Sequence, residues 1–211
     1  MSTAPADPAE TLAALEAEIA RCRLCRDAPR GATLPHQPRP VLRPSTTARL
    51  LIAGQAPGTR VHASGLPFTD PSGDRLRDWM GVTKDVFYDR ARIAIVPMGF
   101  CFPGQDAKGG DLPPRRECAP VWRARVMAAM PAIDLVLAVG RPAQLWHLGA
   151  DAGASLGETM TRWREILARP TFPKVLPLPH PSWRNSAWLK RRPWFEADVV
   201  PELRRLVAER L

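Results

Sequence analysis

Four short apolar runs, separated by stretches with helical patterns, constrain the fold of this 211-residue chain most strongly. The runs are residues 49–54, 92–97, 134–139 and 174–178, and their side chains are mostly aliphatic. Short strands of this kind are typical of a parallel sheet that is buried on both faces. Because the strands alternate with helices, the pattern predicts an α/β fold. We expect a three-layer α/β/α sandwich with a central, mainly parallel four-stranded sheet.

The helical pattern predicts five helices after the first strand and one before it. They are expected at residues 8–21, 73–81, 118–130, 142–148, 158–168 and 195–210. Pro201 lies inside the last span and favours a helix that begins at that proline. Between the first helix and the first strand, residues 26–47 form a loop rich in Pro and Arg. A loop of this length is expected to be tied down or functional.

Length and composition favour one domain over residues 1–211, with the helix and cysteine-bearing loop of residues 8–47 packed on it. No apolar run approaches the ~18 residues that a membrane-spanning helix needs. Residues 1–10 lack the basic and apolar regions of a signal peptide. We therefore expect a cytoplasmic monomer without a membrane partner.

The chain is strongly basic, with 30 Lys and Arg residues against 21 Asp and Glu residues, a net charge of +9 and a pI of about 10.4. Most of the cations are Arg, whose guanidinium group binds phosphate through two hydrogen bonds. A pI above about 9 is typical of nucleic-acid binding. Abundant Arg, Ala and Pro also follow from GC-rich coding, so the charge alone leaves both interpretations open.

Two short motifs follow the first and the last predicted strand. Gly54-Gln55-Ala56-Pro57-Gly58 comes after the first strand, and His180-Pro181-Ser182-Trp183-Arg184-Asn185 comes after the last. Ligands of open α/β sheets bind beyond the carboxyl ends of the strands. The two loops are therefore predicted to form one site, with a Gly/Pro backbone on one side and a His/Ser pair on the other.

Several side chains in and near these motifs suit catalysis. Gln55 offers an amide that orients a water or binds a base edge, and a neutral His180 donates to developing negative charge. Between the motifs, Phe68 offers a stacking surface and Asp70 a carboxylate that activates water. The alternatives are a core phenylalanine and an aspartate that caps a turn or helix.

The segment after His180 mixes aromatic, apolar and basic residues through Arg192. Such a mixture suits DNA, because cations hold phosphates while a bulky side chain fills an unstacked space. Ser182 adds a hydroxyl that hydrogen-bonds phosphate. The alternative is a half-buried loop in which the Arg side chains only reach into solvent.

Four cysteines occur as a C-x2-C pair, Cys22 and Cys25, and as the more distant Cys101 and Cys118. In a chain expected in the cytoplasm, a C-x2-C pair favours metal or redox chemistry over a structural disulfide. The pair follows a helix and precedes a loop, unlike the strand-to-helix position of thioredoxin-type pairs, and this favours ligation. Thiolates suit both zinc and an iron–sulfur cluster. Four independent buried thiols are the other interpretation.

Taken together, these segments resemble the uracil-DNA glycosylase superfamily, in particular its iron–sulfur branches, families 4 and 5. Gly54–Gly58 is similar to the first superfamily motif. His180–Asn185 is similar to the second and close to its form in the single-strand-selective glycosylases. Gly65–Phe68 is similar to a GxPF segment whose Phe stacks on the flipped base, and the cysteine spacing is similar to that of [4Fe–4S] ligands in families 4 and 5.

The resemblance implies a role for each candidate residue. The catalytic residues would be Gln55, Asp70 and His180, the base-binding residues Gln55, Ala56 and Phe68, the DNA-binding residues Ser182, Trp183, Arg184, Asn185 and Lys190, and the cluster ligands Cys22, Cys25, Cys101 and Cys118. The cofactor would be a [4Fe–4S] cluster rather than zinc, and the partner DNA that contains a damaged base.

Two positions depart from the family pattern. Ala56 stands where family 1 enzymes have an Asp, so Asp70 or Gln55 would hold the catalytic water, and family 5 places a functional Asp near Asp70. Pro97 stands where families 1 and 4 have an Asn that reads uracil. Family 5 also lacks that Asn and accepts other deaminated bases, so strict uracil specificity is not implied.

The function expected from the resemblance is a monofunctional DNA glycosylase for uracil or a related deaminated or modified base, acting in base excision repair. Neither motif contains a Lys that could form a Schiff base for a coupled lyase step. The alternatives are a non-catalytic iron–sulfur protein of the same fold that binds nucleic acid, and a glycosylase for an unusual modified base.

Overall fold

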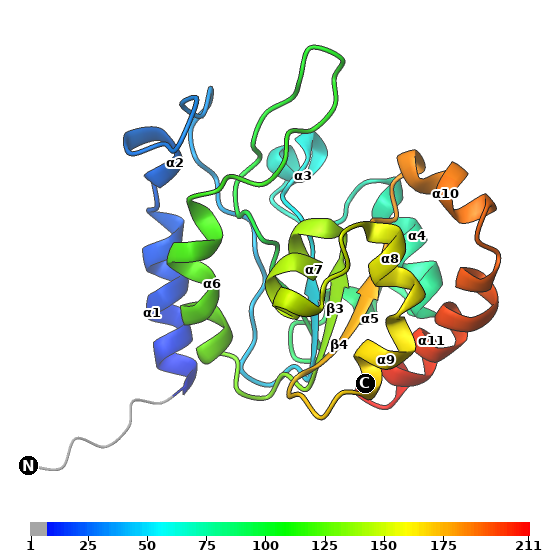
Figure 1. Ribbon diagram of the computed structural model, residues 1–211. Coiled ribbons are helices and arrows are strands. Elements are labelled where there is room, and N and C mark those ends of the chain that lie inside the picture. The colour runs from blue at the N-terminus through cyan, green and yellow to red at the C-terminus, as the bar shows by residue number, and fades with distance from the viewer. Residues whose placement is uncertain (1–7) are drawn as a thin grey trace, which may run out of the picture.

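Four parallel strands form one central sheet in the computed structural model of the chain, which describes residues 8–211 (Figure 1). The strands are β1 (Leu50–Ala53), β2 (Ile93–Ile95), β3 (Leu135–Val139) and β4 (Lys174–Leu178). All four lie within the predicted segments, so the predicted α/β sandwich is confirmed. Residues 1–7 of the predicted domain lie outside the described residues.

The strand order is β2-β1-β3-β4, so the chain first turns to one side of β1 and then to the other. Leu51 accordingly pairs with Ala94 of β2 and with Val136 of β3. In open α/β sheets, a crevice for ligands opens where the winding direction changes. This topology places that crevice at the carboxyl end of β1, where the first motif begins.

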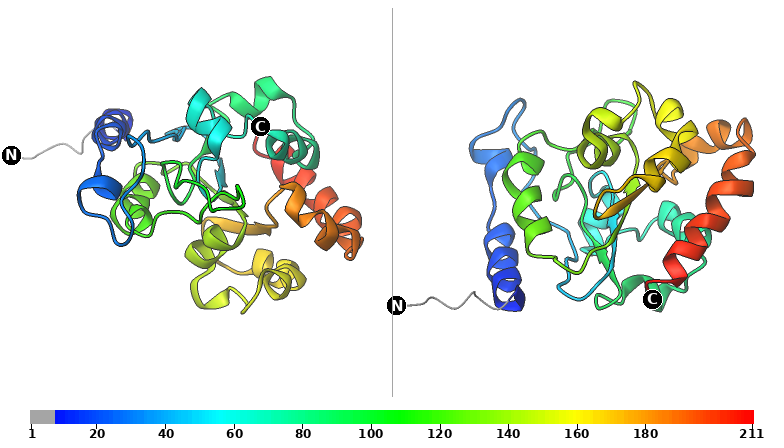
Figure 2. Two further views of the ribbon diagram at one scale, coloured as in Figure 1. Left: turned by 90° about the horizontal axis from the view of Figure 1, so that it is seen from above. Right: turned by 60° about the horizontal axis from the view of Figure 1, so that its bottom comes forward.

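Helices cover both faces of the sheet (Figures 1 and 2). The α-helices are α1 (Pro8–Ala20), α2 (Leu24–Asp27), α3 (Thr59–Ser64), α4 (Pro71–Met80), α5 (Lys84–Tyr88), α6 (Cys118–Ala128), α7 (Arg141–Leu148), α8 (Leu156–Thr161), α9 (Trp163–Ala168), α10 (Ser186–Lys190) and α11 (Val200–Ala208). Shorter helical turns are η1 (Gly149–Asp151), η2 (Trp183–Asn185) and the π-helical η3 (Phe195–Val199). Within residues 8–211, no helix is both long and apolar enough to cross a membrane.

Alternate residues of each strand point to opposite helical layers. On β1, Leu50 and Ile52 pack with α4, α5, α9 and α11, whereas Leu51 and Ala53 pack with α6, α7 and α1. Figure 1 shows α1 alongside α6 at one flank of the molecule. The buried side chains of α1 therefore extend the core on the α6 face.

Two predicted helices are wrong in detail. The helix expected at residues 158–168 is divided into α8 and α9, because Arg162 leaves the helical region with φ −97° and ψ 14°. The helix expected at residues 195–210 begins as the π-helical turn η3 and continues as α11 from Val200. Pro201 has no N–H to donate one turn back, which explains why the regular ladder starts only there.

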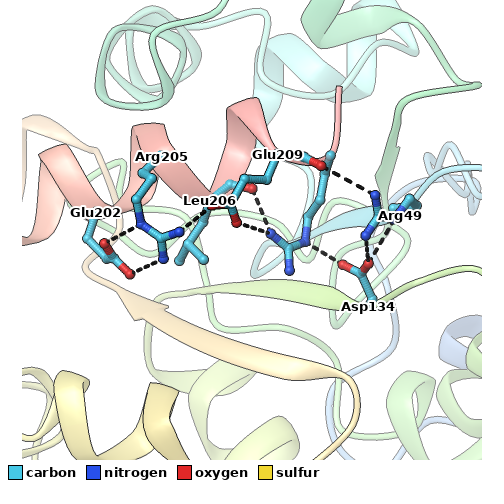
Figure 3. A network of polar contacts seen from close by, with 7 residues as sticks. Arg49, Asp134, Glu202, Arg205, Leu206 and Glu209 are labelled. Atoms are coloured by element: carbon cyan, nitrogen blue, oxygen red, sulfur yellow. Dashed lines mark hydrogen bonds and ion pairs between the residues drawn. The ribbon is translucent and has the colours of Figure 1, made fainter.

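A network of charged side chains closes the amino end of the sheet (Figure 3). Asp134 lies just before β3. Its Oδ2 accepts a hydrogen bond from Arg49 Nε at 2.8 Å, and its Oδ1 accepts one from Arg210, which follows α11. Arg205 of α11 pairs with Glu202 at 2.7 Å. This network fastens the C-terminal helix to the sheet at the end opposite the two motifs.

Candidate active site

One pocket at the carboxyl end of β1 brings the two motifs together. Its lining residues come from both motifs and from the chain between them: Val41, Gly54, Gln55, Ala56, Pro57, Gly58, Val61, Pro67, Phe68, Asp70, Ser72, Ile95, Pro97 and His180. All predicted catalytic and base-binding residues are in this set. A second, more open groove between α9 and α11 contains none of the motif residues. The chemistry suggested by the sequence therefore belongs to the pocket at β1.

The backbone of the first motif is fixed by the loop after β2. Met98 donates its N–H to the carbonyl of Gly54 at 3.0 Å, and Gly99 donates to the carbonyl of Gln55 at 2.8 Å. The Gln55 side chain lies against Gly140 at the end of β3, where an added Cβ would be 2.3 Å from Gln55 Nε2. Gly140 has φ +84°, so two constraints require glycine at that position. This contact could not be predicted from the sequence, because it joins the loops that follow two different strands.

His180 is held as a neutral hydrogen-bond donor. Its Nδ1 accepts the backbone N–H of Ser182 at 3.2 Å, so the ring proton of the neutral form is on Nε2. Burial lowers the pKa of His180, and nearby Asp70 opposes this shift only partly. Asn185 donates its side-chain N–H to the His180 carbonyl at 2.7 Å, closing the loop. The remaining Nε2–H is available to a group in the pocket.

Asp70 has two distinct carboxylate oxygens. Its Oδ1 caps α4 by accepting the backbone N–H groups of Ser72 at 3.0 Å and Gly73 at 3.2 Å, and it also accepts the Ser72 hydroxyl. The cap predicted as the alternative role is therefore present. Oδ2 receives no hydrogen bond from any described residue, and Asp70 lines the pocket with His180. The cap orients the carboxylate and leaves one oxygen for a water or ligand.

Phe68 adopts a strained backbone conformation at the pocket. It has φ +56° and is the non-glycine residue with a positive φ among residues 8–211. A left-handed conformation costs a bulky residue of the order of 1–3 kcal/mol and persists only when the surroundings enforce it. Tyr88 donates its hydroxyl to the carbonyls of Pro67 at 2.8 Å and Phe68 at 3.1 Å. Gly73 allows the close approach, since an added Cβ would be 1.9 Å from the Phe68 carbonyl oxygen.

The Phe68 ring is placed by its neighbours on both sides. It packs against Gly54, where an added Cβ would be 3.4 Å from its Cζ, and meets the Phe87 ring edge-on with centroids 6.0 Å apart. Phe68 thus contacts the core through Phe87 and also contributes to the pocket wall, where the predicted stacking surface would lie.

The loop after His180 exposes only part of the predicted DNA-binding set. Trp183 is 77% exposed, Arg184 and Lys190 are also exposed, and the Arg184 guanidinium lies 5.7 Å from the centroid of the Trp183 ring. The Asn185 side chain and the Ser182 backbone N–H bond to His180, and both side chains are half-buried. These bonds support the histidine, and the three exposed side chains form a basic and aromatic rim.

A hairpin over residues 103–112 approaches this rim. Gln105 pairs with Asp111 across the hairpin, and the Arg184 guanidinium lies beside Gly110, where an added Cβ would be 2.8 Å from its Nη2. Hydrogen bonds from the backbone N–H groups of Gly110 and Lys108 lower the pKa of Asp106, with a smaller contribution from Arg184. No local sequence pattern reveals the contact with Arg184, because it joins two segments that lie far apart in the chain.

The four cysteines gather around a separate cavity. The rest of the lining is apolar and comes from Leu24, Pro38, Pro40, Phe100 and Trp122. Cys22 is half-buried, the other three are buried, and all four are free thiols. Burial, with the neighbouring cysteines, raises the pKa of both Cys101 and Cys118 to about 12.

The cysteine cavity offers sulfur donors and little else. The Cys118 sulfur accepts the Phe100 N–H at 3.3 Å, and buried Glu117 holds Arg30 N at 2.9 Å and Arg115 Nη2 at 2.8 Å beside the cavity. Among residues 8–211, no three His, Cys, Asp or Glu side chains are arranged to hold a single metal ion. The convergence of four thiols nevertheless argues against four independent positions, and an all-sulfur donor set fits a soft metal or an iron–sulfur cluster.

One comparison with known proteins bears on this geometry. The family model described as the uracil DNA glycosylase superfamily matches residues 42–204. The match includes both motifs, the pocket residue Phe68 and the rim, and it begins after the C-x2-C pair. It covers well over half of the chain, and the pocket-lining residues other than Val41 lie inside it. The chain therefore belongs to the uracil DNA glycosylase superfamily, whose domain has a DNA glycosylase type of function.

Proposed function

We propose that the protein is a monofunctional DNA glycosylase that hydrolyses the N-glycosidic bond of uracil or of a related deaminated or modified base. The observation that carries the proposal is the convergence of the Nε2–H of neutral His180, the free Oδ2 of Asp70 and the ring of Phe68 in one pocket. Together they supply an anion stabiliser, a water-binding carboxylate and a stacking surface, which are the groups that base hydrolysis needs.

The geometry supports a specific division of labour. A flipped base would stack on Phe68 and leave with the bonding electrons of the C–N bond. His180 would donate its Nε2–H to the anionic base that forms. The neutral ring can do this while its Nδ1 accepts the Ser182 N–H. Asp70 Oδ2, with the Gln55 amide, would hold the water that adds to the sugar carbon, and the carboxylate would receive its proton.

The pocket wall bears on which base is accepted. Pro97 has neither a side-chain amide nor a backbone N–H, and Val41, Val61 and Ile95 add further apolar surface. Gln55 is the amide side chain that lines the pocket. A base would therefore be read mainly through shape, stacking and backbone groups, which favours a tolerance for several deaminated or modified bases.

We further propose that Cys22, Cys25, Cys101 and Cys118 hold a [4Fe–4S] cluster. Four thiols that line one buried cavity form an all-sulfur donor set, which suits such a cluster. The cluster would join the C-x2-C segment to the loop after β2 and to the start of α6. Its contribution would be structural stabilisation.

The function is tested with oligonucleotides that carry uracil, hypoxanthine, xanthine or hydroxymethyluracil. Each would be assayed for abasic sites, in single-stranded and in duplex form. Release of at least one base supports the proposal, and its identity defines the specificity. Tight binding to all oligonucleotides with no base release would instead favour a non-catalytic nucleic-acid-binding protein, for which the lack of a carboxylate at Ala56 is the supporting observation.

Asp70→Asn should separate the cap from catalysis. Asn caps helices about as well as Asp, so the free energy of unfolding should change by less than about 1 kcal/mol. The neutral amide cannot take a proton from water, and single-turnover base release should slow by roughly 10²-fold or more. Asp74→Asn, in the same helix but exposed, is the matched control. If Asp70→Asn released base at the wild-type rate, Asp70 would not hold the catalytic water, and Gln55 alone would be left for that role.

Substitutions in the rim should separate phosphate binding from base flipping. Lys190→Ala should weaken binding to every DNA sequence and reduce the salt slope by about one unit. Arg184→Ala and Trp183→Ala should slow base release in duplex far more than in single-stranded DNA, because a single strand has less stacking to disrupt. Salt titrations and the ratio of the two rates distinguish these effects. Variants that match the wild type in both measurements would show that the rim is a solvated connection.

A further inference from the structure

Arg123 is a fully buried cation beside the pocket and outside both motifs. Its exposed fraction is 0%, and it is the largest completely buried side chain among the described residues. Among residues 8–211, no carboxylate acts on its charge. Burial lowers the pKa of Arg123 to about 9, so it is still a cation at neutral pH. An unpaired buried charge is costly, which suggests a role beyond filling space.

The hydrogen bonds of Arg123 converge on the end of β2. Nη1 donates to the carbonyl of Val96 at 2.7 Å and to that of Pro97 at 3.3 Å. Nη2 lies 2.7 Å from His147 Nε2 on α7, and because a guanidinium only donates, the histidine nitrogen accepts. Burial and the adjacent Arg123 lower the pKa of His147 to about 3, which keeps this acceptor neutral. One side chain thus joins α6, α7 and the loop after β2.

That loop in turn holds the first motif. Pro97 lines the pocket, and the next two residues, Met98 and Gly99, bind the carbonyls of Gly54 and Gln55. A shift of Val96 and Pro97 would therefore move both the pocket wall and the backbone that carries Gln55. Arg123 also lies on the helix that begins with Cys118, so it is a physical connection between the cysteine cavity and the pocket.

We propose that Arg123 is a positioning residue for base release, which fixes the Val96–Gly99 segment, and through it the first motif, from the cysteine-bearing helix. The inference deepens the proposed glycosylase function and rests on it. Arg123 does not touch the base: it sets the geometry of the groups that do. A displacement of about 1 Å at such a site can cost roughly 10²-fold in rate.

Arg123→Met tests this proposal, with Arg123→Lys as the conservative variant and Arg125→Met as the matched control. Arg125 is on the same helix but exposed, where it pairs with Glu18. Two measurements are needed: hydrogen exchange of the Met98 and Gly99 amides in protein without DNA, and the single-turnover rate of base release. Arg123→Met should raise the exchange rates at least tenfold and slow base release 10–100-fold, with DNA affinity unchanged. In Arg123→Lys, both the amide exchange rates and the rate of base release should lie between those of the wild type and Arg123→Met. In Arg125→Met, neither rate should differ from the wild type.

The outcomes separate the two proposals. Protected amides in Arg123→Met, or a normal rate despite rapid exchange, would overturn the positioning role. If Arg123→Met does not fold, Arg123→Gln decides, because its short amide cannot reach both the Val96 carbonyl and His147. Wild-type exchange and rate in that variant would overturn the proposal, and an intermediate loss of both would support it. If the wild type releases no base from any oligonucleotide, the proposed function fails, while the exchange measurement still tests the link from Arg123 to the first motif.

Discussion

Replacement of His180 by Ala is expected to slow single-turnover base release by roughly 10²–10³-fold, the usual loss when one charge-stabilising donor is removed. The donor is the Nε2–H left free by the Ser182 bond to Nδ1. DNA affinity should change little, because His180 faces the pocket rather than the rim. His36→Ala, which alters a histidine outside the pocket, is the control. Full activity in His180→Ala would show that His180 does not stabilise the departing base.

The pH dependence of the rate tests the same histidine. Because burial lowers the pKa of His180 below the ordinary histidine value near 6.5, its ring takes up a proton only at a lower pH than an exposed histidine does. We expect the single-turnover rate to decline as pH falls through this lowered pKa, where a proton on Nδ1 would oppose the Ser182 N–H, and to decline at a lower pH than an ordinary histidine would give. A rate that rises as pH falls would indicate that a protonated His180 is the active form.

Replacement of Cys118 by Ser is expected to have the largest effect on stability. Loss of a ligand would release the cluster and with it the connection between α6 and the C-x2-C segment. A loss of more than about 4 kcal/mol is typical of a lost metal site, and in a chain of this size it lowers Tm by roughly 10 °C.

The measurements for the cysteine prediction are the visible spectrum, the iron and sulfide content and the melting curve of anaerobically purified protein. The wild type should be brown and contain iron and sulfide, and Cys118→Ser should be colourless. Colourless wild-type protein with stoichiometric zinc would overturn the iron assignment. Wild-type protein with no metal and four reactive thiols would overturn ligation by these cysteines.

The sequence predicted the fold and most of the pocket because both follow from local patterns. The four apolar runs became the four strands, and motifs at the ends of β1 and β4 had to meet at one edge of a parallel sheet. His180 and Gln55 could therefore be assigned to one site from their positions after strands. Asp70 could be recognised both as a cap and as a pocket carboxylate, since its two roles use different oxygens.

What the sequence did not reveal depends on contacts between distant segments. The hydrogen bonds of Arg123 to Val96 and of Tyr88 to Phe68 produce no periodic pattern in the sequence. The same holds for the contact between Gly140, which follows β3, and the Gln55 side chain, which follows β1. Asn185 stays a predicted DNA-binding residue, and the sequence did not reveal that its amide also supports the His180 backbone. Residue type alone does not distinguish a polar side chain that faces a partner from one that braces its own loop.

If this pocket releases a base from DNA, the free base can be detected as a product. Wild-type protein and His180→Ala would be incubated in excess over single-stranded oligonucleotides that carry uracil or hypoxanthine, and the released base would be identified by mass. We expect free base and a matching abasic site with the wild type, and a rate roughly 10²–10³-fold lower with His180→Ala. Intact oligonucleotides across the whole panel with the wild type, or equal release by both proteins, would contradict this expectation.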